Sequence, residues 1–371
     1  MALISWPLGG AFEKRVLFYA ESPVKVAMFR PIQERLSADG RVGVWFAGQL
    51  LGSQSSKVMA RKLGITGVKP IHRGLSSLAR FDALITADYE LWSGYDKPFA
   101  PIAKTPRVQI FHGVSVRNGA VQPSMTQFAR LFSVGPYMTR RFVEQGIFEA
   151  DDPRLVPVGM PKTDRFFDGS LDRDATLEAL GLDKDRPTIM LAPTWLRRSP
   201  LTEYGDALLE ALASGPWNLI VKLHDKFLDA RYNQIDWIGK LAAFGARDGC
   251  AVLLDEYDAV PFLWASDLLI SDLSSIANEY ALLDRPLVYL RVGADEKLVT
   301  QYPRLDLDTW GQRAGEAVDS VEACVRAVEA GLADPGARSS FRKELGRDLF
   351  YNHGQASQHA ADAMNGLLGL T

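Results

Sequence analysis

Arg107-Val108-Gln109-Ile110-Phe111-His112-Gly113 is a short apolar run that ends at a histidine followed by a glycine. A second run of this kind, Leu219-Ile220-Val221-Lys222-Leu223-His224, lies in the second half of the chain. Both runs predict a buried strand with a histidine where the strand ends. Ligands of open α/β sheets bind at that edge of the sheet. The chain has five histidines, and these two predict a site shared between two domains.

Short apolar segments alternate with helical patterns along the whole chain, which favours doubly wound parallel sheets. In the first half we expect strands at residues 15–20, 42–47, 81–86, 107–111, 132–134 and 155–159, and helices at 25–36, 53–63 and 136–145. In the second half we expect strands at 187–193, 217–223, 251–254, 267–271 and 286–290, and helices at 174–180, 204–214, 260–265, 275–283, 320–332 and, with an interruption near Asn352, 339–370.

A chain of 371 residues is too long for one ordinary core, so this rhythm predicts two Rossmann-like α/β domains facing each other across a cleft. Glycine and proline in Gly159-Met160-Pro161-Lys162 mark the expected boundary. We expect an N-terminal domain at 1–160 and a C-terminal domain at 161–345. The C-terminal helix, 346–371, is expected to pack back on the first domain.

Composition excludes several classes of protein. The net charge of −3 gives no basic footprint for nucleic acid, and the two cysteines have no metal-binding spacing. Met1 to Lys14 lacks the pattern of a signal peptide, and no apolar run reaches the length of a membrane helix. We therefore expect reduced cysteines and a cytoplasmic protein, whose attachment to a membrane, if any, is peripheral on the inner face.

The segment that follows the first strand-end histidine could carry acid–base chemistry. His112 can act as a general base if its pKa stays near the working pH. Gly113 permits close approach of the backbone, and Arg117 adds a fork that binds anions. The alternative is a structural histidine that caps a loop.

The second strand-end histidine has a cation beside it. Lys222 is expected on the same face of the strand as His224, and this pair suits a phosphate group. The alternative is a charge pair at the sheet edge with Asp225. A third segment, Leu191-Ala192-Pro193-Thr194-Trp195-Leu196-Arg197, opens from a strand into a polar loop. Thr194 and Arg197 would lie at the cleft, unless the loop is only a solvated turn.

A fourth segment, Ile270 to Tyr280, has two serines where a helix begins. Ser274 or Ser275 can cap that helix, with Asn278 or Glu279 near the capping-box position. The same geometry, with exposed N–H groups and hydroxyls, can bind an anion. Asp272 flanks the serines, and Glu279 could accept hydrogen bonds from ribose hydroxyls. No phosphate-binding loop, zinc-peptidase helix or hydrolase elbow motif is present.

Taken in order, these segments resemble the CDP-glycerol glycerophosphotransferases, which include teichoic-acid primases and polymerases. The resemblance covers residues 105–365 and is carried by His112-Gly113, Gly159 to Asp164, Ala192 to Trp195, Ser271 to Ser275, Leu282 to Pro286 and Gly354 to Ser357. The chain departs from the family pattern where it has Lys222-Leu223-His224 in place of Arg-Pro-His, and Arg117 in place of lysine. Family members also often carry a longer N-terminal region for membrane attachment.

The resemblance implies a GT-B fold in which 1–160 is the acceptor domain and 161–345 the donor-nucleotide domain. It also implies metal-independent transfer without a cofactor. His112 matches the general base on the acceptor hydroxyl, and His224 the histidine on the donor phosphates. Donor binding is expected at Gly113, Arg117, Pro193, Thr194, Arg197, Lys222, Asp272, Ser274, Ser275 and Glu279. The implied partners are a CDP-linked donor such as CDP-glycerol and a polymer or lipid-linked acceptor.

Two alternatives stay open at this point. The first is a GT-B glycosyltransferase or 2-epimerase that uses a nucleotide sugar. The second is a scaffold subunit that binds a nucleotide sugar without catalysis.

Overall fold

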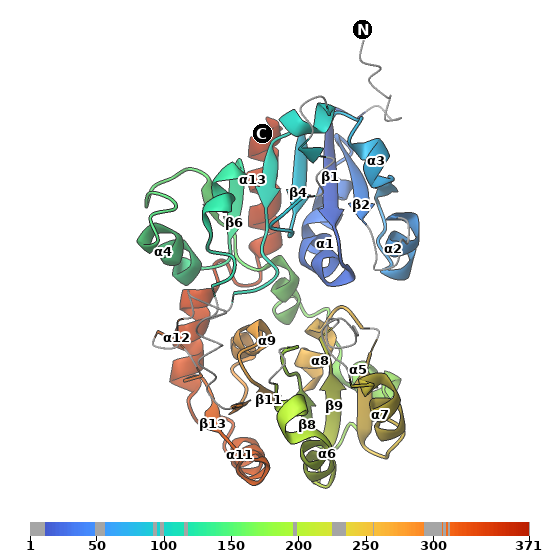
Figure 1. Cartoon of the computed structure of the whole chain (residues 1–371), viewed down its shortest axis with the longest axis vertical. Helices are drawn as coiled ribbons and strands as arrows, with labels where there is room; N and C mark the ends of the chain where they lie inside the picture. The colour runs from blue at the N-terminus through green and yellow to red at the C-terminus, as the bar shows by residue number, and fades with distance from the viewer. Residues whose placement is uncertain are drawn as a thin grey trace. The chain divides into compact units, whose positions relative to one another are not determined.

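The chain forms two compact units, each built on one parallel sheet (Figure 1). The computed structural model describes residues 12–48, 56–91, 95–96, 100–114, 118–195, 199–224, 235–254, 256–292, 306, 309–310 and 312–370. Unit 1 comprises residues 1–112, 120–164 and 350–371, and unit 2 comprises residues 113–119 and 165–349. The predicted class of two doubly wound α/β domains is confirmed.

Within the described residues, unit 1 has a seven-stranded sheet with the order β3-β2-β1-β4-β5-β6-β7. Its strands are β1 Lys14–Ala20, β2 Val42–Gly48, β3 Lys69–Pro70, β4 Ala83–Thr86, β5 Arg107–Gln109, β6 Arg130–Ser133 and β7 Leu155–Pro157. Its helices are α1 Pro23–Ala38, α2 Ser56–Lys62, α3 Arg73–Ser76, α4 Pro136–Glu144 and α13 Ala356–Leu368, with 3-10 turns at Pro101–Lys104, Pro123–Gln127 and Pro161–Phe166. Every residue of β2 is buried, as expected for a parallel strand with helices on both faces of the sheet.

The described part of unit 2 has a six-stranded sheet with the order β10-β9-β8-β11-β12-β13. Its strands are β8 Thr188–Leu191, β9 Asn218–Lys222, β10 Cys250–Leu253, β11 Leu268–Ser271, β12 Leu287–Leu290 and β13 Glu316–Val318. Its helices are α5 Arg173–Ala179, α6 Pro200–Ala213, α7 Trp237–Phe244, α8 Val260–Ala265, α9 Ser275–Tyr280, α11 Val321–Ala333 and α12 Ser339–Leu349, with a 3-10 turn at Ala281–Leu283.

Both sheets reverse their strand order beside their first strand. In unit 1 the reversal lies between β1 and β4, and in unit 2 it lies between β8 and β11. In doubly wound sheets, ligands bind outside the carboxyl ends of the strands at such a reversal. The two switch points therefore locate the candidate sites.

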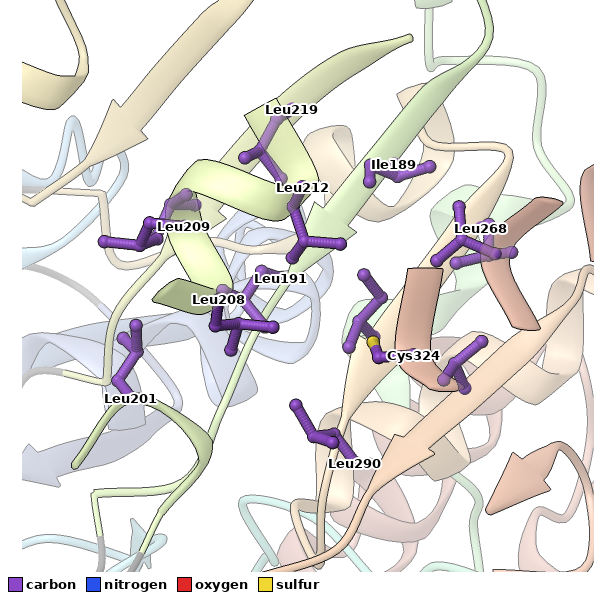
Figure 2. Close-up of a cluster of buried hydrophobic side chains, with 14 of the residues drawn as sticks. Ile189, Leu191, Leu201, Leu208, Leu209, Leu212, Leu219, Leu268, Leu290 and Cys324 are labelled. Carbon is purple, nitrogen blue, oxygen red and sulfur yellow. The ribbon is translucent and has the colours of Figure 1, made fainter. Parts of the chain in front are cut away.

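Leucine and isoleucine side chains from the sheet and its covering helices fill the core of unit 2 (Figure 2). Leu191 of β8, Leu208 of α6 and Leu268 of β11 are fully buried in it. Cys324 of α11 joins the same core, and burial raises the pKa of its thiol to about 12. Cys324 and Cys250 are both buried and free, and Cys324 packs as a small apolar side chain.

Two motif segments that are far apart in the sequence meet in unit 1. Asp164 accepts the backbone N–H groups of Ala356 and Ser357, at 2.9 and 2.7 Å, and so caps the start of α13. Gly159 has a φ of +103°, and a Cβ there would lie 2.3 Å from the carbonyl oxygen of Tyr351. The Gly159 to Asp164 motif thus fastens the C-terminal helix, which packs against α1.

Some elements differ from the sequence-based expectation. Helix α6 begins at Pro200 because Ser199 and Thr202 form a capping box, four residues before the expected start. The edge strands β3 and β13 and the helices α3 and α7 were not expected. Each edge strand has only two or three residues, too few for a period to show. In the part of the chain that the structure describes, no helix is long and apolar enough to cross a membrane.

Candidate functional site

One buried carboxylate joins the two strands at the switch point of unit 2. Asp272 follows β11, is 4% exposed, and accepts hydrogen bonds from the Thr194 N–H at 3.0 Å and the Thr194 hydroxyl at 2.6 Å. Ser271 donates its hydroxyl to the Ala192 carbonyl at 2.7 Å. Pro193 lies buried between the two bonded residues and has no N–H to satisfy. Asp272 therefore fixes Thr194 just beyond the end of β8, and fixed side chains of this kind are what a preorganised ligand site needs.

The next strand of the sheet brings the second histidine to the same edge. β9 pairs with β8, and the ring of His224 lies 6.2 Å from the ring of Trp195, measured between centroids. Lys222 donates to the Glu256 carbonyl at 2.7 Å, so its ammonium group ties the end of β9 to the loop after β10. The predicted contact of Lys222 with a phosphate stays a prediction, and Asp225 lies outside the described residues.

Helix α9 brings the two serines to the exit of β11. Ser274 occupies the N-cap position, but its side chain makes no capping hydrogen bond. The expected capping box is therefore not formed, and Glu279 does not cap the helix. Glu279 is 2% exposed on the buried side of α9, beside Tyr280.

The segment just after His112, residues 113–119, belongs to unit 2, and Gly113 and Val114 contact α9. Asn278 donates its side-chain amide to the Val114 carbonyl at 2.9 Å. A Cβ on Gly113 would lie 2.7 Å from Ser275 Oγ and 3.8 Å from Glu279 Oε1. Gly113 also has a φ of +153°. Residues from both predicted motifs are thus in contact, and only glycine fits between the backbone and Ser275.

His112 lies in unit 1, three residues beyond the end of β5. It is half-buried, and its ring centroid is 5.3 Å from that of Tyr89, with the ring planes 34° apart. Tyr89 comes shortly after the end of β4, the neighbouring strand. The aromatic contact restricts the imidazole to a small range of orientations, a condition for proton transfer to a positioned hydroxyl.

The switch point of unit 1 contains a charged cluster that we did not predict. Asp88, which follows β4 and is 2% exposed, pairs with Lys25 and accepts the Glu21 N–H at 3.2 Å. The Tyr19 hydroxyl donates to the Glu21 carboxylate. Burial raises the pKa of Asp88, and the Lys25 ammonium opposes that shift. Glu21 and Asp88 both follow predicted strands, so the strand-end rule that selected His112 would also have found them.

Two predicted anion contacts, Arg117 and Arg197, lie outside the described residues. Within the described stretches, no three side chains of His, Cys, Asp or Glu group together as a metal-binding set. Metal independence remains a prediction about the reaction.

A single methyl group added to Gly113 should disrupt this arrangement. In Gly113→Ala the new Cβ would lie 2.7 Å from Ser275 Oγ, a distance at which either the backbone or the serine must move. We expect the apparent affinity for the nucleotide donor to fall by at least tenfold, which is about 1.4 kcal/mol. Isothermal titration with the donor measures this loss.

The matched control is Gly119→Ala, because Gly119 belongs to the same short segment and a Cβ there meets nothing within 4 Å. Equal affinities for the two variants would show that the contact with Ser275 has no bearing on donor binding.

These two doubly wound units define the class: a protein with the GT-B type of α/β fold. Residues 117–363, about two thirds of the chain, match the family described as CDP-glycerol:poly(glycerophosphate) glycerophosphotransferase. The chain belongs to this family.

Two individual proteins that resemble the chain are teichoic acid enzymes. The chain is 29% identical over 171 residues to a teichoic acid poly(glycerol phosphate) polymerase of Staphylococcus epidermidis, which covers 45% of this chain and 23% of the relative. It is 30% identical over 146 residues to a teichoic acid ribitol-phosphate primase of Bacillus spizizenii, covering 38% and 36%. The alignments thus span about a quarter and about a third of these relatives' length.

A solved structure of a variant of the wall teichoic acid polymerase TagF has a TM-score of 0.71 to this chain. The superposition covers 96% of this chain and 89% of the other, with 15% sequence identity. At that identity the similarity is one of fold.

Proposed function

We propose that this protein transfers a glycerol-phosphate or related alditol-phosphate group from a CDP-linked donor to a hydroxyl group of an envelope or capsule polymer or its primer. Membership of the family supports the class of reaction. The observation that carries the proposal for this chain is the bonding of Thr194 to Asp272 at the switch point of unit 2, with His224, Ser274 and Ser275 at the same edge. Such an edge is the place where doubly wound sheets bind nucleotides.

The reaction proceeds in one displacement without a metal ion. His112 takes the proton from the acceptor hydroxyl, and that oxygen attacks the donor phosphorus that carries the alditol. A new phosphodiester bond forms, and the bond to the bridging oxygen breaks, which releases CMP. His224 and the hydroxyls of Ser274 and Ser275 stabilise charge on the diphosphate as CMP departs. Positioned donors of this kind are a large source of catalysis because they do not reorganise during the reaction.

The location that goes with this function is the cytoplasmic side of the membrane, where the CDP-linked donor is a soluble metabolite. The acceptor is a polymer or a lipid-linked primer. The alditol of the donor is either glycerol or the larger ribitol. Of the two relatives, one is named for glycerol phosphate and the other for ribitol phosphate.

Binding of nucleotides tests the proposal directly. We expect CDP-glycerol or CDP-ribitol at about 100 times its dissociation constant to stabilise the protein by about 2.7 kcal/mol. The corresponding rise in melting temperature is a few degrees, measured by thermal shift. UDP-N-acetylglucosamine and GDP-mannose serve as competing donors, and EDTA in the turnover assay checks metal independence.

Each outcome of this screen supports one of the three candidate functions. Stabilisation by UDP-N-acetylglucosamine alone would replace the proposal with a nucleotide-sugar enzyme. No stabilisation by any nucleotide would favour the scaffold. Stabilisation by a CDP-alditol, followed by release of CMP when acceptor is added, supports the transferase.

A further inference from the structure

Asn278 is a buried polar residue of α9 that the proposed reaction does not use. It is 6% exposed, and its side-chain amide donates to the Val114 carbonyl at 2.9 Å. The two residues are 164 positions apart in the sequence, so no turn or helix-capping pattern explains the bond. A buried amide that bonds one distant carbonyl satisfies both groups and fixes the backbone to which the carbonyl belongs.

The bonded carbonyl lies two residues after His112. Between them is Gly113, whose φ of +153° is one that other residues rarely adopt. Glycine has the greatest backbone freedom of all residues, so a histidine followed by glycine is held from that side only if the next residue is fixed. Val114 is fixed in two ways, because its side chain is 2% exposed and its carbonyl is bonded by Asn278.

The chain before His112 is anchored separately, in unit 1. The Ile110 N–H donates to the Thr86 carbonyl at 2.9 Å, and Phe111 is 3% exposed. The chain passes from unit 1 to unit 2 between His112 and Gly113. The backbone is therefore fixed by the sheet of unit 1 before the histidine and by α9 after it, and Asn278 supplies the hydrogen bond of the second anchor.

We propose that Asn278 is a positioning residue for His112: by holding the Val114 carbonyl, it fixes the direction in which the imidazole of the base points. The inference rests on the proposed function, in which His112 takes the proton from the acceptor hydroxyl. Such a transfer needs a distance of about 2.6–3.2 Å between the heavy atoms. A displacement of about 1 Å can lower a rate about 100-fold. Asn278 touches neither substrate in this scheme and acts through the backbone of residues 113–114.

The same helix carries Ser275, which the proposed function assigns to the donor phosphates. Ser275 and Asn278 are three residues apart and so share one face of α9, the face that contacts Gly113 and Val114. One short helix thus serves the donor through Ser275 and holds the base through Asn278. Removal of the Asn278 amide should separate these roles, leaving donor binding intact while the base loses its position.

Steady-state kinetics with donor titration test this separation. Asn278→Ala should lower kcat for CMP release about 10–100-fold and change the Kd of the donor by less than about twofold. Asn278→Asp keeps the size of the side chain but sets an acceptor against the Val114 carbonyl, so it should lose at least as much activity. A mere cavity effect would leave Asn278→Asp close to the wild-type protein.

A double variant shows whether Asn278 acts through His112. If the amide only positions the base, Asn278→Ala added to His112→Asn should lower kcat by less than about twofold further. A second full loss in that background would mean that Asn278 serves another part of the site.

The imidazole of His112 provides a measurement that needs no turnover. Its ring lies 5.3 Å from the ring of Tyr89, measured between centroids, so its proton resonances carry a ring-current shift. The chain has five histidines, and comparison with His112→Asn identifies the signal in histidine-labelled protein. We expect Asn278→Ala to move or broaden this signal, because the imidazole is no longer held in one orientation over Tyr89.

Asn218→Ala is the matched control. Asn218 is fully buried at the start of β9, and its side-chain amide donates to the Asp183 carbonyl at 2.6 Å. The control therefore also removes a buried amide–carbonyl bond from unit 2, but at the amino end of the sheet, away from the edge where ligands bind. Both variants should lower the melting temperature by a few degrees. Only Asn278→Ala should change kcat and the His112 signal.

Three results would overturn the proposal: an unchanged His112 signal in Asn278→Ala, a donor Kd that rises as much as kcat falls, or a full further loss in the double variant. Failure of the proposed function has a different signature, since the wild-type protein would then release no CMP from a CDP-alditol. In that case the His112 signal by itself decides whether Asn278 positions the histidine.

Discussion

His112→Asn is expected to lower the rate of CMP release by about 10²–10⁴-fold, the usual contribution of a general base. Asparagine keeps the approximate size and polarity of the imidazole but cannot take a proton at neutral pH. His112 and Tyr89 are both only half-buried, so the substitution should change the stability of the fold little. The rate is measured with saturating CDP-linked donor and a polymer or lipid-linked acceptor.

Donor binding separates the role of His112 from that of His224. The dissociation constant for the donor should be unchanged in His112→Asn, while His224→Asn should weaken it. The pH profile gives a second measure, because loss of the base should remove the acidic limb of kcat. Unchanged turnover in His112→Asn would refute the assignment of the base.

Asp272→Ala should have the largest effect on unit 2. It removes the buried acceptor of the Thr194 N–H and hydroxyl, and it leaves that N–H without a partner in the interior. Hydrogen bonds to a charged group contribute about 1.5–3 kcal/mol each, and an unsatisfied buried group costs about as much. We expect a loss of about 3 kcal/mol in the free energy of unfolding, measured by urea titration.

The donor affinity of this variant should fall by more than tenfold, because the loop that carries Thr194 and Trp195 is no longer held at the switch point. Thr194→Val is the matched control, since it removes the hydroxyl but leaves the N–H bond at 3.0 Å. It should show less than half of the loss of stability. If Asp272→Ala kept full donor affinity, the switch point of unit 2 would not be the nucleotide site.

The departure from the family pattern at Lys222-Leu223-His224 has a structural counterpart. Lys222 donates to the Glu256 carbonyl, so this side chain braces the loop beyond β10. Leu223 is buried in the core of unit 2, where it packs among leucines of α6 and β9. Of the three residues, His224 is therefore the one that the strand end presents beside Trp195.

The class of fold and most strand and helix positions followed from the sequence because they depend on local patterns. An apolar run such as that of β9 has the length and burial of a parallel strand whatever it pairs with. The same runs indicated which residues come at strand ends, and so selected Thr194, Asp272 and His224. Ser199 and Thr202 carried a capping signal in the sequence, and the start of α6 could have been predicted from it.

Only the tertiary structure decided which of those residues touch. The order of strands makes β8 and β11 neighbours, which turns Asp272 into the partner of Thr194, 78 residues earlier in the chain. It also sets Gly113 against Ser275 and Asp88 against Lys25, pairs that no local pattern links. The apolar runs of Arg107 to His112 and Leu219 to His224 therefore determined by themselves that two strands end in histidines. What surrounds each histidine depends on strand order, because the packing free energy that selects the order is summed over the whole sheet.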